Sequence, residues 1–153
     1  MKTFSGLFIL SLLLLSNCKP DPAREVYHPF PNQSWQRFNI LRFEIPVEKS
    51  ETPRNIVFYA RYNQTFPYQA LNFNMIMRLP SGEERVREYQ LAMKNKSDQV
   101  LGTYIGEECE TSLFLKKELF ITKEGMLEIT LENLTPRVET PGLLGVGIRI
   151  QDF

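Results

Sequence analysis

The sequence predicts an all-β protein built as an antiparallel two-layer β-sandwich. Apolar and polar residues alternate with a period of two over several segments of the 153-residue chain. Glycine, proline, asparagine and serine separate these segments at short intervals, as turns between strands do. No segment past residue 24 shows a convincing helical period, although a helix around residues 111–119 remains open.

The first residues predict export and a lipid anchor. Lys2 precedes an apolar run, Leu7–Leu15, which suits a secretory signal and is shorter than the ~20 residues of a membrane-spanning helix. The run ends in Leu-Ser-Asn followed by Cys18, which resembles a bacterial lipoprotein signal, with Asn17 where glycine, alanine or serine is usual. This resemblance implies cleavage before Cys18 and diacylation of its thiol. An ordinary cleavable signal with an incidental cysteine is the alternative.

The chain divides accordingly into three parts. We expect a lipoprotein signal peptide over residues 1–17, the lipidated Cys18 with a short proline-containing tether over residues 18–24, and a β-sandwich domain over residues 25–153. A domain of this length can bury a sizeable core.

Three segments give the clearest strand patterns. Leu41–Val47 alternates apolar with polar residues, and Pro46, which has no N–H to donate, predicts that this strand lies at a sheet edge. Asn55–Tyr62 is apolar on both faces and predicts a central strand. Leu71–Leu79 shows the cleanest alternation, and the Pro-Ser-Gly sequence after it predicts a turn into a returning strand.

The remaining strands are predicted from shorter or weaker patterns. These segments are 84–93, 100–105, 112–115, 118–122, 126–131 and 144–150. We expect an acidic loop at Glu107–Glu110, between the second and third of them, and a hairpin turn at Lys123–Gly125.

The predicted core consists of the inward-facing residues of the best-defined strands. They are Leu41, Phe43, Ile45, Phe58, Phe73, Met75, Met77, Ile129, Val146 and Ile148.

The sequence offers little for catalysis or for cofactor binding. His28 is the only histidine, and no phosphate-binding loop, zinc-binding spacing or nucleophile motif is present. Cys109 stands among three glutamates, an acidic setting that does not favour a reactive cysteine. We therefore predict no catalytic, cofactor-binding or metal-binding residues, while two distant carboxylates meeting across a cleft remain an open alternative. Balanced charge, with 18 basic and 18 acidic residues, argues against a nucleic-acid partner.

One aromatic segment is a candidate partner-binding loop. It contains Tyr62, Asn63, Phe66 and Tyr68, whose rings and amide are suited to anchoring a protein or stacking on a sugar. The alternative is that these rings belong to the core and pin the loop to the end of the sandwich.

Several blocks of sequence, in order, resemble one known family. They are Val26–His28, Pro31–Trp35, Phe43–Pro46, Arg61–Asn63, Phe66–Tyr68, Leu71–Phe73, Leu79–Gly82 and Gly145–Ile150. This order and spacing are similar to those of the gliding-motility lipoprotein GldH family of Bacteroidetes. The resemblance implies an envelope lipoprotein associated with the gliding machinery, itself linked to type IX secretion. It supplies no catalytic residues, and the only functional residue it transfers is Cys18.

Two functions of different class follow from the sequence. The first is an accessory or scaffold lipoprotein, held in the membrane by its lipid and docking on other envelope proteins. The second is a glycan-binding envelope lipoprotein, which a row of exposed aromatic rings with nearby amides would favour. Both place the protein in the cell envelope, with the outer membrane favoured over the inner.

Overall fold

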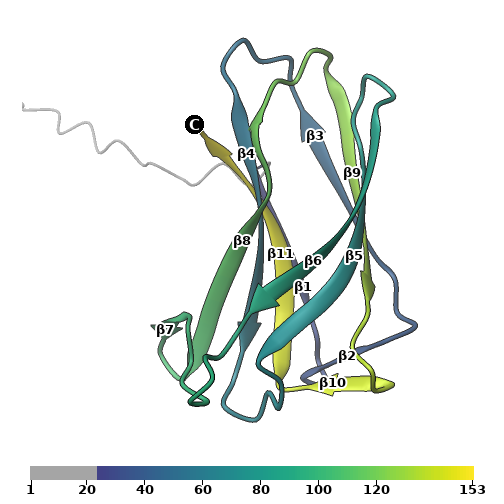
Figure 1. Ribbon diagram of the computed structural model, residues 1–153. Helices are drawn as coiled ribbons and strands as arrows, with labels where there is room; N and C mark the ends of the chain where they lie inside the picture. Colours follow the sequence, from purple (N-terminus) through teal and green to yellow (C-terminus); the bar gives the residue numbers. More distant parts are fainter. Residues whose placement is uncertain (1–23) are drawn as a thin grey trace, which may run out of the picture.

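The computed structural model describes residues 24–153 and confirms the all-β fold (Figure 1). Within these residues, antiparallel strands form a five-stranded sheet, a four-stranded sheet that faces it, and a two-stranded sheet at one end. The predicted signal peptide, Cys18 and most of the tether lie outside the described residues, so these assignments stay predictions.

The five-stranded sheet contains the first and last strands of the described chain. Its order is β1 (Glu25–Pro29), β11 (Leu143–Asp152), β4 (Arg54–Tyr62), β8 (Glu108–Leu119) and β7 (Thr103–Ile105). β4 is central, as its apolar faces predict. Its inward residue Phe58 and its outward residue Tyr59 are both fully buried, so this sheet is covered on both sides along β4.

The four-stranded sheet has the order β3 (Leu41–Val47), β9 (Gly125–Asn133), β5 (Ala70–Arg78) and β6 (Glu84–Ala92). β3 lies at its edge, which confirms the expectation drawn from Pro46. β5 and β6 form the predicted hairpin, and Gly82 in its turn has a φ of 89°, a conformation that favours glycine.

The core between the two sheets contains every residue that the sequence placed there. All ten are at most 3% exposed. Phe58 of β4 packs on Phe73 of β5 with 4.3 Å between the ring centroids, which joins the two layers.

A small sheet that the sequence did not predict closes one end of the sandwich. It pairs β2 (Ser34–Gln36) with β10 (Glu139–Pro141), which crosses the bottom of the view in Figure 1. The buried Asn133 amide donates to the Trp35 carbonyl at 3.1 Å and to the Thr140 hydroxyl at 2.9 Å. Three-residue strands leave too short a pattern to be recognised in a sequence, and so does the five-residue β1.

Two expectations between β7 and β9 are wrong, and the helix that the sequence left open there is absent. Residues 111–119 are not helical, because they belong to the twelve-residue strand β8. The predicted acidic loop at Glu107–Glu110 is mostly strand, because its last three residues begin β8 and pair with β7. The predicted hairpin at residues 123–125 does not exist either, since β8 and β9 belong to different sheets. Register shifts between β8 and β4 interrupt the alternation of β8, which explains why its sequence pattern is weak.

Candidate functional site

The sandwich has two ends of different character. We define the Arg24 end by Arg24, the loops 48–53, 79–83 and 120–124, and the C-terminus, and the opposite end by the loops 37–40, 63–69, 93–102 and 134–138. The strand directions separate the two sets of loops. Neighbouring strands are antiparallel from β1 through β11 and β4 to β8, so β1 and β4 start at the Arg24 end while β11 and β8 start at the opposite end. A chain tethered through Cys18 would be held at the Arg24 end.

An aromatic and charged cluster covers part of the outer face of the five-stranded sheet. We call it the Tyr–Arg cluster, and its members are Glu25, Tyr27, Tyr59, Arg61, Glu110 and Arg149. The Tyr59 hydroxyl donates to Glu25 at 2.5 Å, while Arg149 lies over the Tyr59 ring, 4.4 Å from its centroid. Tyr27 stacks on Tyr59 with 6.0 Å between the centroids.

Two glycines in β11 make room for these rings. A Cβ at Gly147 would approach the Tyr59 ring to 2.5 Å or less, and one at Gly145 would collide with the Tyr27 phenol. Both glycines face the outer side of the sheet, because they alternate along β11 with the inward residues Val146 and Ile148. Their missing side chains allow Tyr59 to lie against the sheet and become fully buried.

The electrostatics of the cluster favour stable charges over proton transfer. The hydrogen bond from Arg149 lowers the pKa of Glu25 below its ordinary value. Arg61 pairs with Glu110 at 3.1 Å, and burial raises the pKa of Tyr59 far above its usual range. The Glu25 carboxylate therefore stays ionised and the Tyr59 phenol stays protonated. Such an arrangement fastens β1 to β11, β4 and β8.

The predicted binding loop is anchored by its aromatic residues. Tyr62 and Phe66 are fully buried, as the core alternative holds, and Tyr68 is half-buried. The Tyr62 hydroxyl donates to the Met93 carbonyl at 2.9 Å, and burial raises the pKa of this phenol to about 12. The Asn63 carboxamide oxygen accepts from Thr65 within the loop. The rings of Tyr62 and Phe66 are thus unavailable to a partner in this conformation.

The exposed part of this loop borders a hollow that the sequence reasoning missed. The hollow has a volume of about 550 Å³ and is lined by Asn63, Gln64, Thr65, Tyr104, Gly106 and Glu107. Tyr104 of β7 is 57% exposed there, and Leu101 and Ile105 beside it in the chain are each 51% exposed. The sequence predicts a short strand over residues 100–105. Its pattern of apolar residues gives no sign that these side chains face solvent.

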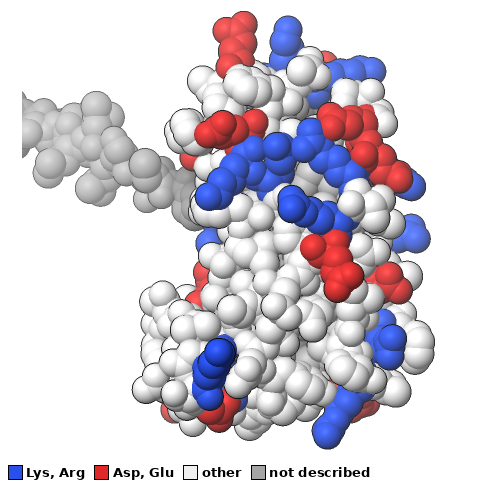
Figure 2. Space-filling view, in the orientation of Figure 1, with Lys and Arg blue, Asp and Glu red and all other residues white. Residues whose placement is uncertain are grey.

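A second exposed apolar group lies at the same end. It consists of Phe38, Ile40 and Val138, and it joins two loops because the Arg37 amide donates to the Val138 carbonyl at 2.7 Å. In Figure 2 charged side chains crowd the upper half of the view, while the lower half, where β7 and β10 lie in Figure 1, carries few.

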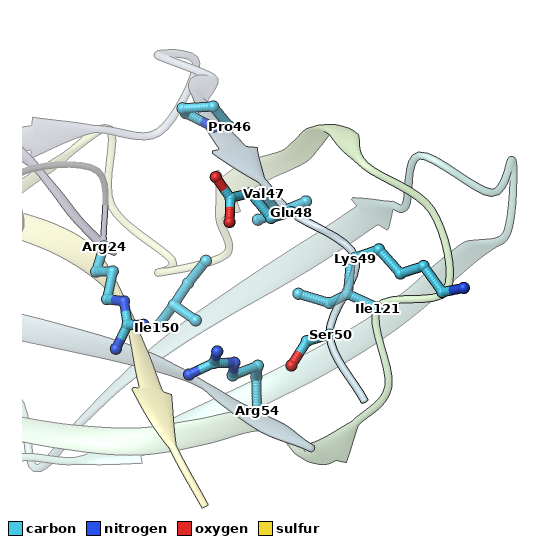
Figure 3. A pocket seen from close by; sticks show the side chains of 9 residues that line it. All are labelled: Arg24, Pro46, Val47, Glu48, Lys49, Ser50, Arg54, Ile121 and Ile150. Atoms are coloured by element: carbon cyan, nitrogen blue, oxygen red, sulfur yellow. The ribbon is translucent and has the colours of Figure 1, made fainter. Parts of the chain in front are cut away.

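A cleft opens between the layers at the Arg24 end (Figure 3). Its volume is about 420 Å³, and its lining residues are Arg24, Pro46, Val47, Glu48, Lys49, Ser50, Arg54, Ile121 and Ile150. Basic side chains on an apolar floor distinguish it from the hollow beside Tyr104.

The groups considered for chemistry are dispersed in the structure. Among residues 24–153, no three histidine, cysteine or acidic side chains lie together as metal ligands would. Cys109 is buried in β8, and His28 in β1 packs edge-on against Phe30. Residues 24–153 contain no helix that is long and apolar enough to cross a membrane.

Comparison with known proteins covers most of the chain. Residues 23–150 match the family model described as GldH lipoprotein. A protein of Flavobacterium johnsoniae named gliding motility lipoprotein GldH is 23% identical over 154 residues, which span 96% of this chain and 95% of that protein. The match includes the strands that carry the Tyr–Arg cluster and both ends of the sandwich.

Proposed function

The chain belongs to the GldH lipoprotein family, and on this premise we propose that Cys18 anchors it in the membrane and that it is a scaffold component of the gliding machinery. In this proposal the β-sandwich contributes docking surface and carries out no reaction. Its partners are other envelope proteins, and the outer membrane is the favoured location.

The observation that carries the docking role is the apolar opposite end. Its two exposed groups are Leu101, Tyr104 and Ile105, and Phe38, Ile40 and Val138, all at least 51% exposed. Clustered apolar side chains on a protein surface mark contacts with other proteins, because their exposure to water is unfavourable. This end also lies farthest along the strands from the tether, so an anchored domain would present it away from the membrane.

The anchor is tested by membrane fractionation of Cys18→Ser. We expect this variant to leave the membrane fraction, because the only thiol available for acylation near the tether is lost. Cys109→Ser is the matched control, since Cys109 is buried in β8 and takes no part in anchoring. Equal recovery of Cys18→Ser and the unmodified protein in the membrane fraction would refute the lipoprotein anchor.

The docking surface is tested by capture from native envelopes. We expect Leu101→Ser with Ile105→Ser to lose the gliding-machinery proteins that co-purify with the unmodified chain. Val86→Ser is the matched control, because Val86 is 61% exposed on β6, away from this end. Capture that survives the double change and falls with the control would place docking elsewhere.

Glycan binding is the second candidate, and one observation favours it. The exposed Tyr104 ring shares its hollow with the amides of Asn63 and Gln64, and aromatic rings next to amides are suited to binding sugars. Titration with soluble envelope glycans tests this candidate. Binding that Tyr104→Ala abolishes would support it, and the absence of binding at millimolar glycan would exclude it in favour of docking on proteins.

A further inference from the structure

We propose that the cleft at the Arg24 end binds the phosphate headgroup of an anionic phospholipid in the membrane that holds the anchor. The inference rests on the proposed function in one respect, since the acylated Cys18 brings this end to the membrane. It adds a binding site for a lipid that is not covalently attached to the chain.

The shape of the cleft suits the polar end of a lipid. Val47, Ile121 and Ile150 form an apolar floor and are each at most 9% exposed. The Arg24 and Arg54 side chains flank Ile150 in Figure 3, and Lys49 stands on the opposite rim with its ammonium pointing outward. A phosphate at the mouth would meet basic groups while the glycerol and first methylenes contact the floor.

The charges of the cleft favour an anion. Its lining residues include three bases, Arg24, Lys49 and Arg54, and one acid, Glu48. Asp152 lies beside the cleft and accepts ion pairs from both Arg24 and Arg54. One base remains in excess when both acids are counted. Guanidinium groups bind phosphate oxygens in a bidentate manner, and Arg54 is held on β4, a rigid central strand.

The length of the tether fixes which end approaches the membrane. Arg24 lies six positions after Cys18, and six residue spacings in extended chain reach at most ~20 Å. An acylated Cys18 therefore holds the cleft close to the headgroup layer.

Exposed apolar side chains at the same end fit this orientation. Phe120 is 55% exposed, Met126 is 44% exposed and Phe153 is 75% exposed. Phe120 and Met126 border the segment that joins β8 to β9, and Phe153 ends the chain after β11. Aromatic and apolar side chains beside basic groups are typical of surfaces that lie in a membrane interface.

The sample is the chain from residue 18 onward, carrying Cys18→Ser so that it is not acylated. NMR follows the signals of individual methyl groups in this protein. The probes are dihexanoyl phosphatidylglycerol, dihexanoyl phosphatidylcholine and glycerol 3-phosphate, each below micelle-forming concentrations. We expect phosphatidylglycerol alone to shift the methyl signals of Ile121 and Ile150. Ile105, at the opposite end, is the internal reference and should not respond.

Variants test the role of charge. Lys49→Gln and Arg54→Gln should each weaken binding about fivefold, the factor typical of one basic side chain near anionic lipid. Lys96→Gln is the matched control, because Lys96 is an exposed lysine in the loop between β6 and β7. Lys49 is also exposed in a loop, and among residues 24–153 no acidic side chain pairs with it, so its replacement should leave the fold intact.

The outcomes separate the alternatives. Equal shifts with phosphatidylcholine, or no shift with any probe, would overturn the proposal. So would equal weakening by Lys96→Gln, which would indicate attraction by overall charge. Glycerol 3-phosphate binding as tightly as the lipid would overturn it too, and would assign the cleft to a free phosphate compound instead. Anchoring is measured separately by fractionation, so failure here and failure of the lipid anchor are distinguishable.

Discussion

Gly147→Ala should destabilise the domain far more than its single added methyl suggests. The new Cβ would lie within 2.5 Å of several atoms of the Tyr59 ring. This ring cannot move aside easily, because it is fully buried, donates to Glu25 and lies under the Arg149 guanidinium. Either the backbone of β11 shifts or Tyr59 leaves its place on the sheet.

The expected cost follows from these two responses. Overpacking a buried site costs ~1–3 kcal/mol, and loss of a hydrogen bond to a charged group costs ~1.5–3 kcal/mol. We expect Gly147→Ala to lower the free energy of unfolding by about 3 kcal/mol. This is a large share of the ~5–15 kcal/mol that stabilises a typical domain. Urea denaturation, followed by the fluorescence of the buried Trp35, measures the change.

Two further variants isolate the cause. Gly82→Ala is the control for backbone conformation. Gly82 has a positive φ, and no atom lies within 4 Å of the place that a Cβ would take. This variant should therefore lower the free energy of unfolding by only ~1 kcal/mol. Tyr59→Ala removes the obstructing ring, and adding Gly147→Ala to it should cost almost nothing more. If Gly147→Ala costs no more than Gly82→Ala, or costs as much without the Tyr59 ring, the steric argument is refuted.

Three other changes test the polar contacts. Because Arg149 lowers the pKa of Glu25, the ionised carboxylate stabilises the fold at pH values above its ordinary pKa of 4.5, and this contribution disappears as the pH falls through the lowered pKa of the folded state. In Glu25→Gln the urea midpoint should therefore decline less steeply over that acidic range. An unchanged pH profile would contradict the assignment. Tyr62→Phe removes the phenol donor to the Met93 carbonyl, which keeps its bond from the Leu101 amide, and should lower the unfolding free energy by ~1 kcal/mol, measured by thermal melting. Asn133→Ala removes donors to two partners in the small end sheet and should cost ~2–4 kcal/mol, with faster amide hydrogen exchange in β10 than in β4.

The longer strands could be predicted from sequence because one face of each is buried. Leu41–Val47 matches β3 residue for residue, and its burial alternates without interruption. Such alternation is strong where a strand is regular and half-buried. In β8 the register shifts against β4 disturb it, and the sequence pattern divides this twelve-residue strand into shorter pieces.

The candidate site was less predictable because it depends on contacts between distant residues. The loop around Tyr62 is recognisably aromatic in the sequence, but the acceptor of the buried Tyr62 hydroxyl is the Met93 carbonyl, which lies 31 positions along the chain. The exposure of Tyr104 and Leu101 could not be predicted either, because it also depends on which distant residues pack nearby. A sequence pattern shows that a side chain is apolar, and the partner strand decides whether that side chain is covered.

Gly145 and Gly147 connect the architecture to the proposed function. Glycine in a strand weakens it unless something packs closely against the backbone, and here the rings of Tyr27 and Tyr59 do so. Tyr27 belongs to β1, the first strand after the proposed tether, and Tyr59 belongs to the central strand β4. A force pulling on an acylated Cys18 would reach β1 first and would act parallel to the strand axis. The five residue pairs between β1 and β11 would then resist this force together. The Tyr–Arg cluster adds side-chain contacts across the same strands, and a scaffold held at one end and docked at the other needs this connection.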